Sequence, residues 1–380
     1  MHPVSCRAPR GDSRLTAGDT GVIIGLLTRV TNYNSMTKQT TAIDVAQLAG
    51  ISRTTVSFVL NDVPGMRISP ETRQRVLDAA RELNYQPNIS ARRLVTGQTR
   101  ILGYVERQAA EPAFSDAFLP LALRGVHDAA SKHGYEVLFA PIPLSDGKER
   151  CTGLLRGRHV DGLILSGPRY DDEELRRLLE EMAPIVVQGQ LPGSQASWVD
   201  VDNVEAARLA VSHLLDLGHT QVAAIIHAPL AYTAAAARLD GFRKAVEAHG
   251  LTVSPEHIAF AEFTAQSGKG AMESLLILDP VPTAVFISSD TVAIGAVHEA
   301  QCRGLRIPDD LAIVGFDDIP MAAYTRPSLT TVHLPAYGLG WGAADLLIRQ
   351  ITEEEVPENQ ILLSTDLVVR GSCGANPSPR

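Results

Sequence analysis

The sequence predicts an N-terminal all-α helix-turn-helix headpiece with a hinge helix, followed by a two-lobed α/β core of doubly wound parallel sheets. The first observation is the segment TAIDVAQLAGISRTTVSFVLN at residues 41–61, in which two short amphipathic helices flank a turn. The second is the region after Ile101, where short β-branched runs alternate with amphipathic helices, as they do in repeated βα units.

Capping signals place the two short helices. Thr41 stands three residues before Asp44, which is the spacing of an N-cap with an acidic N3 partner, so the first helix begins near Ala42. Gly50 ends that helix, and Ser52 can accept hydrogen bonds from the first free amides of the second. The second helix turns its apolar residues inward, namely Val56, Val59 and Leu60.

The outer face of the second helix is polar at its start. Its first turn presents Arg53, Thr54, Thr55 and Ser57, with Phe58 behind them. These donors, acceptors and methyl groups suit base edges and phosphates in a DNA major groove. For an isolated 20-residue segment the alternative is an ordinary helical hairpin, in which Ser and Thr are caps and the Arg is solvated.

A third helix and a short basic segment follow. Ser69-Pro70-Glu71 is an N-cap followed by proline at N1, and it opens the sequence ETRQRVLDAARELNY, which carries apolar residues at helical spacing. Three helices of this kind can enclose a small core. After Pro87, Asn88 can cap a segment of about two turns, which is too short to hold as a helix alone in water. We therefore expect this segment to order against a partner or DNA.

Together these strings resemble the DNA-binding headpiece and hinge helix of the LacI/GalR family of bacterial transcription repressors. The resemblance implies that Arg53 and Thr54 read bases and that Thr55, Ser57 and Asn61 support them. It also places Arg92 and Leu94 in the hinge, where the leucine wedges between base pairs in the minor groove and kinks the duplex. Phe58 departs from the polar or basic residue that is frequent in the family, so its contact would be apolar, as with a thymine methyl group.

Charge is divided along the chain in agreement with this assignment. Residues 36–100 hold nine Lys and Arg and five Asp and Glu, a net charge of +4, whereas residues 101–380 carry −15. Because DNA repels an acidic surface, the basic end must be the contact surface. The four cysteines, Cys6, Cys151, Cys302 and Cys373, show no metal-binding spacing and indicate reduced thiols in a cytoplasmic protein.

Domain boundaries follow from these signals. We expect residues 1–35 to be a disordered extension or an over-long start, because Met36 directly precedes the headpiece. The longest apolar run there, GVIIGLL, is too short to span a membrane. The remaining expected parts are a headpiece at 36–86, a hinge at 87–99, a core at 100–373 and a disordered tail at 374–380. Within the core, the N-lobe comprises 100–201 and 334–363, and the C-lobe 202–333 and 364–373.

Strands of the core are predicted at ILGYV, YEVLFAPI, VDGLILSG and PIVVQG, and in a second series at QVAAIIHA, HIAFAEF, TAVFISS and LAIVGFDD. Amphipathic helices such as LALRGVHDAASKHG and NVEAARLAVSHLLDLG connect them. TTVHLP and a later helix that begins at Tyr337 should then return to the first lobe. Ligands of such sheets bind outside the carboxyl ends of the strands, which here means the cleft between lobes.

The core resembles the periplasmic-binding-protein fold of LacI/GalR repressors through the strings HLLDLGH, ARLDGF, SSDTVAIGA and GLRIPDDLAIVGFDD, among others. The resemblance implies a cleft arginine at Arg238 and an acidic counterpart at Asp317. It further implies that Phe118, Tyr232 and Phe263 form part of the wall of the ligand cleft, and that Ser289 is a polar contact there.

The chemistry of these residue types fits a polyol. The guanidinium of Arg238 offers only donors and Asp317 only acceptors, so the two can bind vicinal hydroxyls from both sides. The alternatives are a structural ion pair of Arg238 with Asp240 or another carboxylate, and a turn or cap role for Asp317. Asp171 and Asp172 are better explained as helix caps. The apolar loop PLAYTAAAA argues against a strongly anionic effector and favours a neutral sugar or similar polyol.

Motifs of nucleotide-binding enzymes and hydrolases do not occur, since GxGxxG, GxxxxGK[ST] and GxSxG are missing after the strands. We expect no catalytic residues, no cofactor and no metal. The predicted function is a homodimeric cytoplasmic repressor that associates with the nucleoid when bound to a pseudo-palindromic operator, and a sugar in the cleft controls its operator affinity. The rival is a transport-type sugar-binding protein, against which the headpiece argues.

Overall fold

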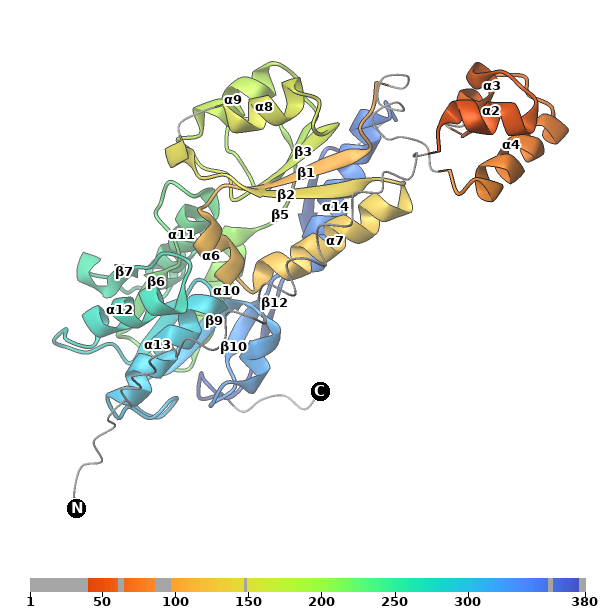
Figure 1. The fold of residues 1–380 in the computed structure, drawn as a ribbon. Coiled ribbons are helices and arrows are strands. Elements are labelled where there is room, and N and C mark those ends of the chain that lie inside the picture. The colour runs from red at the N-terminus through yellow and green to blue at the C-terminus, as the bar shows by residue number, and fades with distance from the viewer. Residues whose placement is uncertain (1–39, 61–64, 86–96, 147–148, 355–357, 376–380) are drawn as a thin grey trace, which may run out of the picture. The chain divides into compact units, whose positions relative to one another are not determined.

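The computed structural model describes residues 40–60, 65–85, 97–146, 149–354 and 358–375. The chain divides into two compact units, Met1–Gly97 and Gln98–Arg380, which are considered separately below (Figure 1). The expectations for residues 1–35, for the end of the tail, and for Asn61, Arg92 and Leu94 lie outside the described residues.

The described residues of the first unit form the helices α2 (Ala42–Ala49), α3 (Arg53–Leu60) and α4 (Pro70–Glu82). The predicted caps are confirmed, since Thr41 and Asp44 form a capping box and the amide of Thr55 donates to Ser52 Oγ at 3.1 Å. Gly50 ends α2 with φ of 64°, a left-handed conformation that glycine adopts without steric cost. The helices enclose a small core of Val45, Ala46, Ala49, Val56, Val59, Val76, Ala79 and Ala80.

The first sheet of the core is entirely parallel, with the strand order β11-β5-β4-β3-β1-β2. Its strands are β1 (Ile101–Glu106), β2 (Glu136–Pro141), β3 (Gly162–Ser166), β4 (Ile185–Gln188), β5 (Ser197–Val201) and β11 (Gln360–Leu363). Helices α7 (Phe118–Lys132) and α14 (Ala336–Ile351) pack on one face, and α8 (Arg150–Arg156) and α9 (Glu173–Glu180) on the other. The short helix α6 (Ala110–Ser115) precedes α7.

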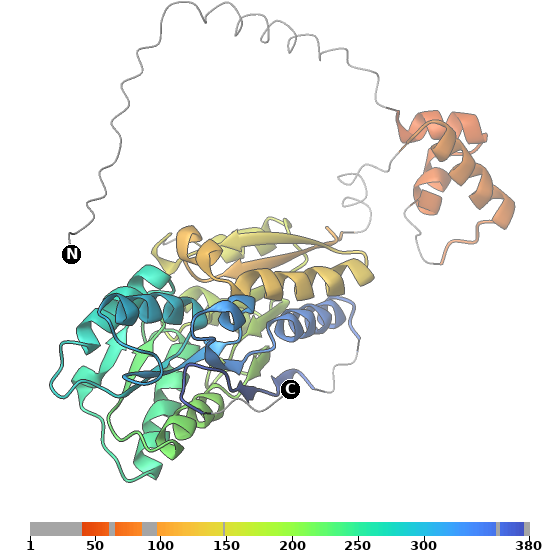
Figure 2. The ribbon, with the colours of Figure 1, turned by 90° about the horizontal axis from the view of Figure 1, so that it is seen from below.

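The second sheet has the order β12-β10-β9-β8-β6-β7 and is parallel except for the edge strand β12. Its strands are β6 (Val222–Ile226), β7 (Ile258–Phe260), β8 (Ala284–Ile287), β9 (Ala312–Asp317), β10 (Thr330–His333) and β12 (Asp366–Val368). Helices α10 (Asn203–Asp216) and α11 (Thr233–Ala248) cover one face, and α12 (Ala265–Leu275) and α13 (Asp290–Cys302) the other. Figure 2 shows the two sheets as separate lobes of one unit.

Several details differ from the sequence-based expectation. TTVHLP does not return to the first lobe, because β10 pairs with β9 and belongs to the second sheet. The chain crosses back only after His333, with α14 packing beside α7 (Figure 1). In addition, β5 was not predicted, because Asp200 interrupts the apolar run of SWVDV, so that the segment reads as a loop before Asp202.

Close packing of α7 on α14 depends on two glycines. A Cβ atom at Gly125 would lie 2.1 Å from the carbonyl oxygen of Tyr337, and one at Gly340 would lie 2.0 Å from that of Ala122. Both distances are far inside van der Waals contact, so only glycine permits this helix separation. The pair fixes α14 against the first sheet and thereby sets where the chain crosses between the lobes.

Candidate ligand-binding cleft and DNA-reading helix

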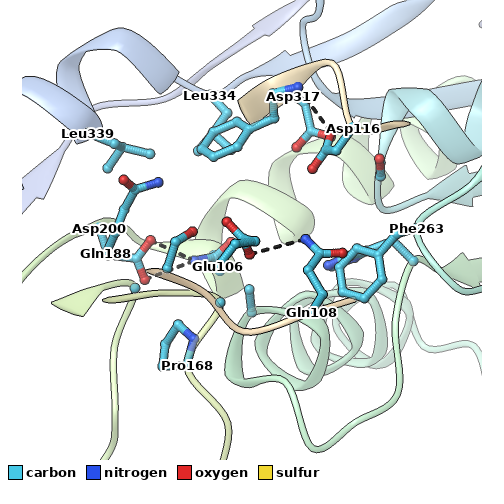
Figure 3. A pocket seen from close by; sticks show the side chains of 18 of the residues that line it. Glu106, Gln108, Asp116, Pro168, Gln188, Asp200, Phe263, Asp317, Leu334 and Leu339 are labelled. Atoms are coloured by element: carbon cyan, nitrogen blue, oxygen red, sulfur yellow. Dashed lines mark hydrogen bonds between the residues drawn. The ribbon is translucent and has the colours of Figure 1, made fainter. Parts of the chain in front are cut away.

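A pocket of about 710 Å³, including its open mouth, lies where the carboxyl ends of the two parallel sheets face each other (Figure 3). This is the position expected for a ligand in doubly wound sheets, and the enclosed part of the pocket measures about 120 Å³. Its polar lining comprises Glu106, Gln108, Asp116, Ser166, Gln188, Asp200, Asn203, His227, Arg238, Ser289 and Asp317. Its apolar lining includes Phe118, Pro168, Phe263, Leu334 and Leu339.

Arg238 projects from α11 and is held on three sides. Its Nε donates to Asn203 Oδ1 at 2.9 Å, and its Nη1 donates to the carbonyl of Ser288 at 2.7 Å and to Asp317 Oδ1 at 3.4 Å. The guanidinium also lies over the ring of Phe316, 3.7 Å from its centre. Arg238 therefore pairs with Asp317 across the second lobe, whereas the alternative partner Asp240 pairs with Lys244.

Asp317 ends β9 in a left-handed conformation, with φ of 116°. Buried Asp290 supports this turn, since its carboxylate accepts hydrogen bonds from the amide of Ile319 at 3.1 Å and from Thr331 Oγ1 at 2.7 Å. The carboxylate fills the space beside Gly315, where a Cβ atom would lie 2.1 Å from Asp290 Oδ1. The GFDD sequence thus holds the Asp317 side chain at the cleft.

Burial shifts the carboxyl groups of the cleft toward their neutral forms. Desolvation raises the pKa of Asp317 to about 7, although Arg238 opposes the shift. Desolvation likewise raises the pKa of Glu106 to about 7 and that of Asp200 to about 6. Burial lowers the pKa of His227 well below its usual range, and Arg238 adds to this effect, so the imidazole is neutral. The cleft therefore has several acceptors and a single cation among its described lining residues.

Five of the six predicted effector positions line this pocket: Phe118, Arg238, Phe263, Ser289 and Asp317. Sequence reasoning missed the polar residues that the first lobe and its neighbours contribute, above all Glu106, Gln108, Asp116, Gln188, Asp200 and Asn203. Glu106 and Gln188 could have been predicted from the sequence, because each is a polar residue at the carboxyl end of a buried strand. Ligand-binding residues of parallel sheets gather at these strand ends.

Tyr232 does not line the pocket as predicted but joins the two lobes beside it. Its hydroxyl donates to the carbonyl oxygen of Arg107 in the first lobe at 2.8 Å. Its ring lies between the guanidinium of Arg169, at 4.6 Å, and the ring of Phe263, at 5.0 Å. Backbone hydrogen bonds from Tyr170 to Ala231 and from Thr233 to Pro168 continue the contact. Residues 168–170 and 231–233 are called the interlobe clasp below.

We predict that Tyr232→Phe lowers ligand affinity about 3- to 10-fold, because one buried hydrogen bond contributes about 1 kcal/mol and its loss leaves a buried carbonyl unsatisfied. Calorimetric titration of the purified protein measures this change. Tyr135→Phe is the matched control, since the buried Tyr135 hydroxyl has no hydrogen-bond partner among the described groups. Equal affinities for both variants would show that the clasp does not stabilise the ligand-bound form.

The first unit presents its predicted DNA-reading positions on α3. Arg53 and Thr54 are exposed at the start of the helix, whereas Thr55, Ser57 and Phe58 are half-buried. Thr55 is partly committed to the cap, because its Oγ1 lies 2.9 Å from Ser52 Oγ. The two side chains at the exposed first turn are therefore the ones freest to reach a base edge.

Comparisons with known proteins define the class to which this combination of headpiece and cleft belongs. Residues 41–88 match the family "Bacterial regulatory proteins, lacI family", and residues 211–373 match the "Periplasmic binding protein-like domain". The HTH-type transcriptional regulator CelR of Thermobifida fusca is 36% identical over 331 residues, which cover 86% of this chain and 96% of CelR. The transcriptional repressor CytR of Escherichia coli K12 is 34% identical over 339 residues, covering 88% and 96%.

Solved structures give the same assignment. A CelR–cellobiose complex shares 34% identity at a TM-score of 0.68, covering 88% of this chain and 99% of that one. The lac repressor dimer bound to operator and the anti-inducer ONPF shares 27% identity at a TM-score of 0.77, covering 89% and 100%. The chain belongs to the LacI family of bacterial regulatory proteins. It is a DNA-binding transcriptional regulator and not an enzyme.

Two further findings concern the described residues alone. None of their helices combines the length and apolar character that a membrane crossing requires. They also contain no group of three or more His, Cys, Asp or Glu side chains placed to hold a metal ion.

Proposed function

We propose that the protein is a cytoplasmic, nucleoid-associated repressor that binds a pseudo-palindromic operator as a homodimer. A neutral sugar in the cleft lowers or raises its affinity for the operator. The observation that carries the ligand class is the pairing of Arg238 with Asp317 in a cleft that Phe118 and Phe263 also line. Donors and acceptors set side by side suit vicinal hydroxyls, and aromatic rings suit the apolar face of a sugar. The cellobiose complex of CelR and the operator-bound lac repressor dimer support the proposal by similarity.

A homodimer suits this task because two headpieces related by twofold symmetry match two half-sites. Ligand and operator binding are then coupled by one free energy, so a ligand that weakens operator binding must itself bind the operator complex more weakly. The hinge positions Arg92 and Leu94 belong to this proposal as minor-groove contacts. A transport-type sugar-binding protein shares the two-lobed core, but it does not explain the three-helix unit at Ala42–Glu82.

The proposal is tested first by a thermal-shift screen of the full chain against neutral sugars, polyols, nucleosides and sugar phosphates. A ligand that binds only the folded state raises the melting temperature. We expect the stabilising compounds to be neutral sugars, and these should change the affinity for genomic operator fragments. Stabilisation by nucleosides or sugar phosphates alone would overturn the ligand class.

Arg53→Ala tests the DNA-reading assignment. A side chain that reads a base edge contributes about 1–3 kcal/mol of discrimination, so the variant should lose about 10- to 100-fold of its preference for operator over scrambled DNA. Arg81→Ala is the control, since Arg81 is exposed on α4 and pairs with Asp78. That change should weaken binding to both DNAs equally or not at all. An unchanged preference in Arg53→Ala would remove Arg53 from the readout.

A further inference from the structure

One end of the cleft offers acceptors almost exclusively. It is formed by Glu106 at the end of β1, Gln108 two residues later and Asp116 just before α7, and these three residues are called the acceptor wall here (Figure 3). Glu106 and Gln108 are each 6% exposed, and Asp116 is half-buried. Three carbonyl or carboxyl groups at one end of a buried site require donors from whatever fills it.

Protein donors satisfy only part of the acceptor wall. Gln108 Nε2 donates to Glu106 Oε1 at 3.1 Å, and the amide of Phe118 donates to Asp116 Oδ1 at 3.0 Å. The remaining oxygen of the Gln108 amide, Oε1, is buried and has no hydrogen-bond partner. In this orientation the amide nitrogen of Gln108 faces the carboxyl group of Glu106, and its oxygen is the atom left without a donor. A buried acceptor without a donor is unfavourable, and a hydrogen-bond donor on the ligand would remove this cost.

Charge at the acceptor wall is unbalanced as well. Arg238 is the one cation among the described residues that line the cleft, and it is already bonded to Asn203, Ser288 and Asp317. An anionic group placed against Glu106 and Asp116 would meet like charge without a free counter-charge. A hydroxyl group there would donate to a carboxylate in a charge-assisted hydrogen bond, which is roughly twice as strong as a neutral one.

We propose that the acceptor wall is the specificity-determining part of the cleft: it binds adjacent hydroxyl groups of the sugar as donors and excludes sugars that carry a carboxylate or phosphate at that end. This inference rests on the proposed function and deepens it by naming the chemistry that the ligand presents to Glu106, Gln108 and Asp116. The Arg238–Asp317 pair of the second lobe supplies further contacts to the ligand.

The test titrates the full chain by calorimetry with neutral sugars (glucose, maltose and cellobiose) and with glucuronate and glucose 6-phosphate. Glu106→Gln keeps the side-chain shape but replaces an acceptor-only group by one that also donates. The affinity of this variant for the bound neutral sugar should fall at least tenfold. The ratio of its affinity for glucose to its affinity for glucuronate should also become smaller. Asp116→Asn should also lower the affinity for the neutral sugar. The local structure should be kept, because the remaining side-chain oxygen can still accept from the Phe118 amide.

Glu111→Gln is the matched control, since Glu111 lies between Gln108 and Asp116 in the sequence but is exposed on α6. It should bind sugar within twofold of the unchanged protein. The melting temperature of unliganded Glu106→Gln should not fall, because the buried site then holds an amide in place of a carboxylate. A lower melting temperature would indicate a structural role instead and would count against the inference.

The two proposals fail in different ways. If neutral sugars bind and both Glu106→Gln and Asp116→Asn retain full affinity, the acceptor wall is overturned while the sugar-responsive regulator stands. If glucuronate or glucose 6-phosphate binds the unchanged protein more tightly than neutral sugars, the exclusion of anions is wrong. If no sugar binds at all, the proposed ligand class falls and the acceptor wall falls with it.

Discussion

Replacing Arg107 with methionine should lower the free energy of unfolding by about 3–5 kcal/mol, because it leaves a buried carboxylate without its counter-charge. Arg107 is 2% exposed, and its Nη2 donates to Asp172 Oδ1 at 2.6 Å while its Nε donates to the other oxygen of the same carboxylate. Glu174 accepts a third hydrogen bond at 3.3 Å. Methionine fills much of the volume but cannot replace these donors.

Urea-induced unfolding of the two variants Arg107→Met and Arg156→Met measures the effect against a control. Arg156 pairs with Glu181 on the surface, where both side chains are more than half exposed, so its loss should cost less than about 1 kcal/mol. Adding Asp172→Asn to Arg107→Met should recover part of the loss, since it removes the unpaired buried charge. The side-chain oxygen of the new asparagine can still accept from the backbone N–H of Leu175 and cap α9. No recovery in the double variant would mean that packing, and not the unpaired charge, causes the instability.

The Arg107 network also reaches the cleft. Arg107 directly follows Glu106, and its carbonyl oxygen accepts the hydrogen bond from Tyr232 of the second lobe. The buried ion pair therefore helps to hold the end of β1, which carries Glu106 of the acceptor wall and the Arg107 carbonyl that accepts from Tyr232 of the interlobe clasp. A loosened β1 end would disturb ligand binding as well as stability.

Local signals predicted most of the fold. The caps at Thr41, Ser52 and Ser69 act over three or four residues, so they could be read from the sequence, and the structure confirms them. Alternating apolar runs and amphipathic helices predicted the doubly wound sheets in the same way. Elements set by distant pairing were missed: β11 and β12 are edge strands of four and three residues, each of which pairs with a strand that is far away in the sequence.

In the candidate site, too, residues with local sequence signals could be predicted, whereas contacts between residues far apart in the sequence could not. Arg238 and Asp317 could be named because they lie in recognisable strings, and Asp172 was read as the helix cap that it is. The role of Asp172 as the buried partner of Arg107 could not be predicted, since 65 residues separate the two. Asp116 joins Glu106 and Gln108 only through α6, which lies between them in the sequence. Tyr232 was placed in the pocket because nothing in the sequence shows that its hydroxyl reaches Arg107.

Asp317→Ala should reduce ligand affinity about 100-fold and abolish the ligand response, while operator binding without ligand is retained. A hydrogen bond to a charged group contributes about 1.5–3 kcal/mol, and this change also leaves Arg238 without its partner carboxylate in the cleft. Operator titration with and without sugar measures the response. Asp318→Ala is the control, because the neighbouring Asp318 carboxylate binds Arg370 at 2.6 Å and does not line the cleft. A retained sugar response in Asp317→Ala would place the ligand elsewhere.

The pH dependence of the sugar affinity tests independently whether Asp317 contacts the ligand. Burial raises its pKa to about 7, and a sugar hydroxyl that donates to it stabilises the ionised form. Ligand binding should therefore release protons near neutrality, so affinity rises as the pH increases from 6 to 8. Glu106, whose pKa is also raised to about 7, contributes in the same direction, whereas His227 stays neutral throughout. Asp317→Ala should flatten this rise without removing it, because Glu106 still titrates, and an unchanged slope would show that Asp317 is not a ligand contact.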